Sequence, residues 1–172
     1  MIVKQGFSVR VQKSLISLVP VLLALLTFAL CVGMAQSSAF GMVRPMVLAI
    51  SVYYWTLFYP SLMPYPAVFA LGIVEDSVSG GLFGISALVL VLAKYLTSRW
   101  LKNLSKMGFK KIWLGAALVM SLIAVVRFIA EFATSGVIPA FTPPVLQLVF
   151  SVLLYPPLHI FLSHIHGIIF KR

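Results

Sequence analysis

A series of six apolar runs is the feature that most constrains what this chain can fold into. The runs cover residues 14–35, 45–59, 66–78, 82–96, 112–132 and 145–170. A helix needs about 20 predominantly apolar residues to cross a bilayer, and several runs reach or approach that length. Only 9% of the residues are charged, whereas a soluble domain typically has about 25%. The sequence therefore predicts an all-α integral membrane protein, a single polytopic domain of residues 1–172 with about six transmembrane helices.

The basic residues predict the orientation of these helices. Lys and Arg outnumber Asp and Glu by 13 to 3, and most of them lie in residues 4–13, 99–111 and 171–172. Because cytoplasmic loops carry an excess of Lys and Arg, all three groups and both termini should be cytoplasmic. An even number of helices must then separate the groups, so residues 61–98 should form a short hairpin of helices three and four. Basic residues beside apolar runs also favour anionic lipids over nucleic acid as a partner.

The first and last apolar runs each have an irregular feature. The basic segment before residues 14–35 is typical of a signal peptide, but a run of about 22 residues exceeds the usual signal core of about 7–15. We therefore expect a retained first helix, with cleavage near Ala35 as the alternative. In the last run, Pro156 and Pro157 remove two backbone donors and predict a kink.

Five ionisable residues are predicted to lie near the outer face of the membrane. They are Arg44 at the start of the second helix, Glu75 and Asp76 at the end of the third, and Arg127 and Glu131 in the fifth. Ionisable groups are costly inside a bilayer and usually pair with one another or face water. We predict that the five form a charge network in the outer leaflet. The alternative is that each side chain lies separately in the wet head-group region.

The hairpin of helices three and four contains several small residues. Gly72, Asp76, Ser79, Gly80 and Gly84 form the predicted surface for helix contact or for a partner protein. In lipid, helices associate through close packing of small residues and a few interhelical polar contacts. Gly80 and Gly84 have the G-x-x-x-G spacing of close helix pairs, although a flexible turn would explain these two glycines equally well.

The sequence contains no pattern that indicates catalysis, metal binding or a cofactor. Glu75 and Asp76 are adjacent, so on a helix they point about 100° apart and do not form an acid–base pair. The three histidines, at positions 159, 164 and 166, lack the i, i+4 spacing of a helical metal site. We therefore expect a protein that is not an enzyme and uses no cofactor.

The stretch from about Arg44 to Leu96 resembles a known family. In order, it contains Arg44-Pro45, Tyr53-Tyr54-Trp55, Pro60, Leu71-Gly72-Ile73-Val74-Glu75-Asp76, Ser79-Gly80, Leu82-Phe83-Gly84 and Lys94-Tyr95-Leu96. Their order and spacing resemble the MreD family of bacterial rod shape-determining proteins, with its Leu-Gly…Asp signature and its Ser-Gly…Leu-Gly turn. Glu75 departs from the family pattern, which often has an apolar residue at that place.

The resemblance implies a multi-pass protein of the bacterial inner membrane. It would act without catalysis beside MreC, the MreB filament, RodA and penicillin-binding protein 2 in cell elongation and lateral peptidoglycan synthesis. One alternative is the substrate-binding membrane subunit of an energy-coupling-factor transporter for a vitamin or metal. Proteins of that class have an Ala-x-x-x-Ala docking pattern in the first helix, whereas Ala24 and Ala29 are five residues apart here. A second alternative, an enzyme of lipid or wall-precursor chemistry, would need a carboxylate or His cluster at one depth.

Overall fold

The structure is a computed structural model that describes residues 18–33, 45–80, 83–100, 103–104 and 107–170. These residues form helices joined by short links, which confirms the all-α prediction. The elements are an N-terminal helix Leu18–Gly33, α2 (Val47–Phe58), η2 (Pro60–Leu62), α3 (Tyr65–Ser79), α4 (Ile85–Trp100), α5 (Phe109–Ser135) and α6 (Thr142–Phe170). Each of the six apolar runs therefore overlaps one α-helix.

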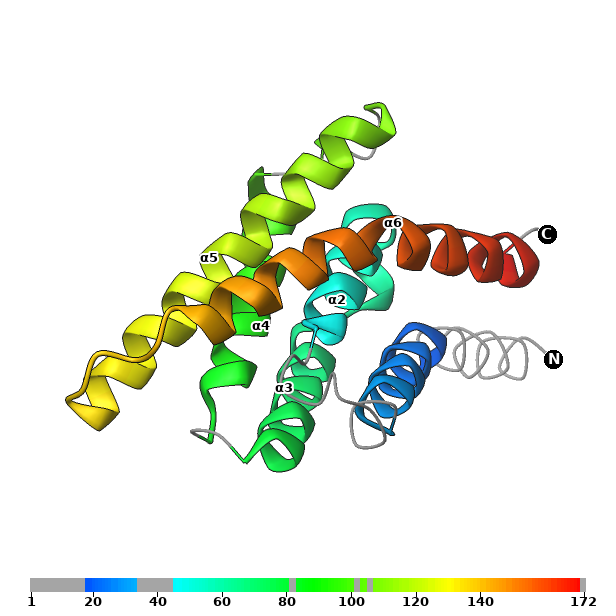
Figure 1. Cartoon of the computed structure of the whole chain (residues 1–172). Helices are drawn as coiled ribbons and strands as arrows, with labels where there is room; N and C mark the ends of the chain where they lie inside the picture. The colour runs from blue at the N-terminus through cyan, green and yellow to red at the C-terminus, as the bar shows by residue number, and fades with distance from the viewer. Residues whose placement is uncertain (1–17, 34–44, 81–82, 101–102, 105–106, 171–172) are drawn as a thin grey trace, which may run out of the picture.

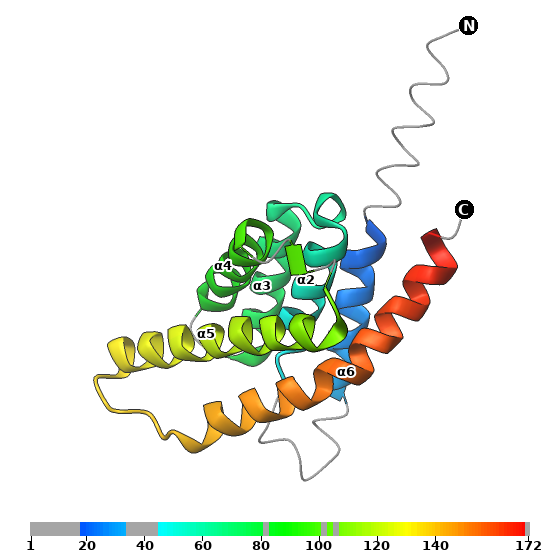
Figure 2. The same cartoon turned by 90° about the horizontal axis from the view of Figure 1, so that it is seen from above.

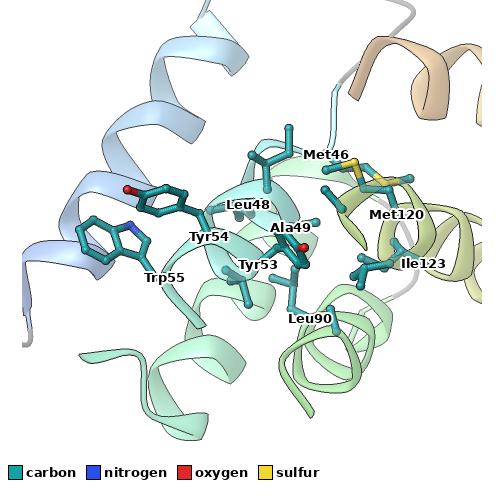
Figure 3. Packing of buried hydrophobic residues seen from close by; sticks show 14 of the residues in the cluster. Met46, Leu48, Ala49, Tyr53, Tyr54, Trp55, Leu90, Met120 and Ile123 are labelled. Atoms are coloured by element: carbon teal, nitrogen blue, oxygen red, sulfur yellow. The ribbon is translucent and has the colours of Figure 1, made fainter. Parts of the chain in front are cut away.

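Helix α2 lies at the centre of the molecule. Every residue from Val47 to Leu57 is buried, and the helix contacts α3, α4, α5 and α6. A helix that is apolar on all sides is expected to be buried on all sides, because it has no polar face to present to solvent. In Figure 3, Tyr54 and Trp55 point from α2 toward the N-terminal helix, while Met120 and Ile123 of α5 lie on the opposite side.

Helices α3 and α4 form the predicted hairpin and pack against each other along their length. Proline at the N-terminus of α3 suits its first turn, where a backbone N–H would lack an intrahelical partner. Gly80 ends α3 in the left-handed conformation (φ 66°), which a residue without a Cβ adopts at little cost. In Figure 1 the C-terminal end of α3 and the α5–α6 link both lie toward the lower side of the picture.

Helices α5 and α6 form a second, longer hairpin. They have 27 and 29 residues, and within the described residues they are the two helices long and apolar enough to cross a membrane. Large apolar side chains such as Leu114, Leu118 and Leu153 stand 60–72% exposed on their outer faces. Extended apolar exposure of this kind suits lipid, because water would penalise it. By contrast α2 has 12 residues, about 18 Å, which is shorter than a bilayer core of about 30 Å.

The two prolines of α6 bend the helix without ending it. Pro156 and Pro157 lie inside one continuous helix, which changes direction along its length in Figure 2. Pro156 lacks the N–H that would bond to the carbonyl of Val152, four residues earlier. That carbonyl instead accepts a hydrogen bond of 3.0 Å from the indole Nε1–H of Trp113 in α5. A neighbouring helix thus satisfies a backbone group that the proline leaves free, as membrane helices require.

Candidate functional site

Asp76 organises the turn between α3 and α4. Its Oδ2 accepts a hydrogen bond of 2.7 Å from the backbone N–H of Gly84, and its Oδ1 accepts one of 3.1 Å from the N–H of Ser86. The first N–H groups of a helix have no intrahelical partner, and a carboxylate there also meets the positive end of the helix dipole. Asp76 therefore fastens the C-terminal end of α3 to the start of α4.

Gly72 allows α3 and α4 to approach closely. A Cβ at this position would lie 2.2 Å from the Cα of Ala87 and 2.5 Å from its backbone nitrogen, so only glycine fits. Gly80 and Gly84 play a different part, since both have positive φ (66° and 96°) and open space where a Cβ would be. The G-x-x-x-G hypothesis for helix contact within the chain is therefore wrong, and the alternative of a turn explains these two glycines.

An ion pair joins α3 of this hairpin to α5. The Arg127 guanidinium Nη2 lies 2.7 Å from Glu75 Oε1 and also donates a hydrogen bond of 3.1 Å to Ser86 Oγ. The side chain of Glu75 is 10% exposed, and the side chain of Arg127 is 24% exposed. Ser86 thus links the two carboxylates, because its hydroxyl accepts from Arg127 while its N–H donates to Asp76. Three helices meet in this network of four side chains.

The ion pair leaves two of its own polar atoms unsatisfied. Glu75 Oε2 and Arg127 Nε are both buried and have no hydrogen-bond partner among the described residues. Two hollows flank the pair. One, of about 240 Å³, includes Phe28, Val32 and Ser79 in its lining, and the other, of about 330 Å³, is bounded by Ser79, Glu131, Thr134 and further residues of α4 and α5. Glu75 borders the first hollow, Asp76 borders the second, and Arg127 borders both.

The structure brings some residues of the predicted charge network into contact, but not all of them. Arg127 pairs with Glu75 and not with Asp76, whose oxygens are taken by backbone N–H groups. Glu131 is exposed on α5, one turn beyond Arg127, and the described residues contain no ion pair for it. Arg44 lies outside the described residues. Sequence reasoning missed Ser86, which lies five residues after the predicted hairpin turn.

A second cluster, which sequence reasoning also missed, is aromatic. His159 of α6 lies 5.2–5.8 Å, between ring centroids, from Tyr54, Phe58, Phe109 and Tyr155. The hydroxyl of Tyr155 is 3.4 Å from Nδ1 of His159. These contacts enclose the imidazole of His159 among aromatic rings from three helices. The aromatic residues themselves were visible in the sequence, but their convergence on α6 depends on the tertiary fold.

Lys94 lies in α4, near the start of α3. It is 3% exposed, and its ammonium lies 4.8 Å from the ring centroid of Tyr65, at the start of α3. An ammonium over an aromatic face is attracted by the negative charge of the ring. The contact joins the two helices of the hairpin at the end opposite to Asp76.

Comparisons with known proteins give two matches. Residues 12–165 match the family model described as rod shape-determining protein MreD. The chain is also 30% identical, over 100 residues, to the rod shape-determining protein MreD of Haemophilus influenzae. That alignment covers 55% of this chain and 58% of the relative, so the chain spans just over half the length of this curated protein. No solved structure matches the chain.

Proposed function

Because the chain belongs to the MreD family of rod shape-determining proteins, we propose that it is a non-catalytic membrane subunit of the machinery that sets cell shape. The family match over residues 12–165 is the observation that carries the proposal, and it agrees with the resemblance of residues 44–96. The geometry is compatible with this role, since the described polar groups mainly hold helices together. Within this proposal the chain contributes to lateral peptidoglycan synthesis through other proteins and performs no reaction of its own.

The proposed location is the bacterial inner membrane, with six spans and both termini in the cytoplasm. Support comes from the basic groups at residues 4–13, 99–111 and 171–172, which the positive-inside rule places in the cytoplasm. The arrangement of the helices is compatible with this topology, because the C-terminal end of α3 and the α5–α6 link lie toward the same side in Figure 1. The short helices α2, α3 and α4 would cross beside α5 and α6 in a locally thinned bilayer.

A reporter fusion tests this topology. A reporter active only in the cytoplasm should work after Arg172 and be silent at Gly136, which ends α5. Activity at Gly136 would contradict the six-span arrangement, because the α5–α6 link would then be cytoplasmic.

The proposed partners are an MreC-like protein, RodA with penicillin-binding protein 2, the MreB filament and anionic lipids. Of the predicted contact residues, Gly72 and Asp76 are buried inside the chain, and α2 is buried throughout. The accessible part of the proposed partner surface is therefore the outer face of the α3–α4 hairpin. Its exposed residues include Phe69, Val78, Ser79, Phe83 and Leu88.

Matched double variants test the shape role and the surface together. In a rod-shaped cell that depends on this chain, Phe83→Ala with Leu88→Ala should give rounded cells and reduced recovery of the MreC-like partner. The control, Leu114→Ala with Leu118→Ala, removes equally exposed side chains from α5. It should leave cell shape and partner recovery unchanged. Protein level in the membrane is measured for both. Normal shape and full partner recovery with the hairpin variant would place the surface elsewhere.

Deletion of the protein separates the shape role from the carrier alternative. Loss of the chain should give rounded, poorly elongating cells that still make wall precursors. Intact rods that fail to take up a vitamin or metal would contradict the shape role and favour a transporter subunit.

A further inference from the structure

The link between α5 and α6 exposes a cluster of large apolar side chains. Val137, Ile138 and Phe141 are 64–69% exposed, and the link projects away from the other helices in both views (Figures 1 and 2). Exposed apolar clusters mark contact with a partner or a membrane, because water penalises them. The link is therefore suited to an apolar or interfacial environment.

Several polar groups at the start of this link are satisfied by the chain itself. The hydroxyl Oγ of Ser135 lies 2.7 Å from the carbonyl oxygen of Glu131, and it accepts a hydrogen bond of 3.3 Å from the backbone N–H of Val137. Three of the residues from 139 to 144 are prolines, which have no N–H that needs a partner. A polar group that is already bonded or missing costs little to remove from bulk water. The link can thus enter a less polar layer at a reduced cost.

The apolar surface of the link continues onto the two long helices. Exposed large apolar side chains recur every three or four residues from Leu114 to Phe132 on α5, and every fourth residue from Phe141 to Leu153 on α6. Residues at these intervals share one face of a helix. Residues 132–170 contain no Asp, Glu, Lys or Arg, so no such charge interrupts the surface between the two helices. The surface of the link is therefore continuous with the faces of α5 and α6 that suit lipid.

The length of α5 indicates the depth of the link. Lys111 and Glu131 are exposed charged residues of this helix, and the 20 residues from one to the other span about 30 Å, the thickness of a hydrocarbon core. Gly136 ends the helix five residues later, about 7 Å farther along its axis. The head-group layer is about 5–7 Å thick on each side of the core, and a tilt of the helix would bring the link closer to the core. The link thus lies at the depth of the lipid head groups.

We propose that the α5–α6 link is a lipid anchor, which rests in the head-group layer and inserts Val137, Ile138 and Phe141 among the acyl chains. The head-group layer supplies water to the backbone groups that remain unbonded, which the hydrocarbon core could not do. Apolar side chains inserted to this depth hold a segment at the boundary between head groups and acyl chains. The link has no basic residue, so the anchor fits phospholipids without regard to head-group charge. It rests on the proposed membrane location but not on the role in cell shape.

Single nitroxide labels on the full chain in phosphatidylcholine vesicles test the anchor. Cys31→Ala removes the single cysteine of the chain, and a new cysteine at Ile138 then carries the label. Collisions with oxygen, which concentrates in lipid, are compared with collisions with a water-soluble nickel chelate. The oxygen-to-nickel ratio at Ile138→Cys should lie well above that of Lys110→Cys, at the start of α5, and below that of Leu118→Cys, within its apolar stretch. Phosphatidylglycerol added to the vesicles should leave this order unchanged.

A variant without the apolar side chains links the insertion to the link itself. Val137→Asn with Ile138→Asn should expose a label at Phe141→Cys to water, so its oxygen-to-nickel ratio should fall toward that of Lys110→Cys. Trp100→Asn removes a 75% exposed apolar side chain at the end of α4 and should leave the label at Phe141→Cys unchanged. Helical circular dichroism checks that both variants fold.

Three results would overturn the proposal. A ratio at Ile138→Cys equal to that of Lys110→Cys would place the link in water. Few collisions with either oxygen or nickel would show that protein covers it, as in contact with a second copy of the chain. An unchanged label at Phe141→Cys in the folded double asparagine variant would show that the two side chains do not hold the link in lipid. None of these results bears on rod shape, so failure here is distinguishable from failure of the proposed function.

Discussion

The two helical hairpins are held together by different forces. Helices α3 and α4 approach until the backbones of Gly72 and Ala87 leave no room for a Cβ, and buried charges join them to α5. Helices α5 and α6 pack through apolar faces, and Trp113 of α5 donates a side-chain hydrogen bond to a backbone carbonyl of α6. In lipid, apolar burial gives little preference for one helix partner over another, so close packing and polar contacts must specify the pairing. The shorter hairpin is therefore the more tightly specified one.

The largest expected effect concerns the ion pair between α3 and α5. Glu75→Leu leaves the guanidinium of Arg127 without its carboxylate and should lower the free energy of unfolding by about 3 kcal/mol, since breaking a buried pair strands a charge. Arg127→Leu should act similarly. The double variant should be more stable than either single variant, because no charge remains unpaired.

Unfolding by denaturing detergent in mixed micelles provides the measurement for this cycle. Glu131→Gln is the control, because this exposed acid has no ion pair among the described residues, and it should change stability by less than about 0.5 kcal/mol. Strictly additive single effects would show that the two side chains lie separately in the head-group region.

Gly72→Ala should have the next largest effect. The new Cβ would collide with the backbone of Ala87, which cannot rotate away, so the helices must separate. Overpacking of this kind costs about 1–3 kcal/mol. Gly115→Ala should cost less, because its Cβ meets the ends of two side chains, Tyr53 and Leu104, which can move. Detergent unfolding measures the stability of both variants. If they lose the same free energy of unfolding, the backbone contact at Gly72 is no tighter in effect than the side-chain contact at Gly115.

Asp76→Asn should have an intermediate effect on the α3–α4 turn. The amide keeps one acceptor oxygen and loses both the second acceptor and the negative charge at the start of α4. We expect a loss of about 1–2 kcal/mol. Amide hydrogen exchange should accelerate at Gly84 or Ser86 and remain slow in α5. Faster exchange throughout the chain would instead indicate a global role for Asp76.

The sequence allowed prediction of the helices, but not of the partners of the charged side chains. Apolar runs and basic groups are local features, so residues 61–98 were expected to form a hairpin and the structure has one. The choice between Glu75 and Asp76 as the partner of Arg127 depends on helix rotation, which adjacent acids on one helix do not reveal. Likewise, Gly72 is recognisable as the contact glycine only when the backbone of Ala87 is in place.

The smallest expected effect tests the longer hairpin, through the bond from Trp113 to the carbonyl of Val152. Trp113→Phe should cost about 1 kcal/mol, the net value of a typical hydrogen bond. Pro156→Ala restores the N–H that can bond to the same carbonyl, so in that background Trp113→Phe should cost clearly less. The non-additivity, measured by detergent unfolding, is the signature of a carbonyl that either donor can satisfy. If Trp113→Phe costs the same in both backgrounds, the indole stabilises the hairpin through its apolar area alone, and α5 and α6 are then joined without any specific polar contact from Trp113.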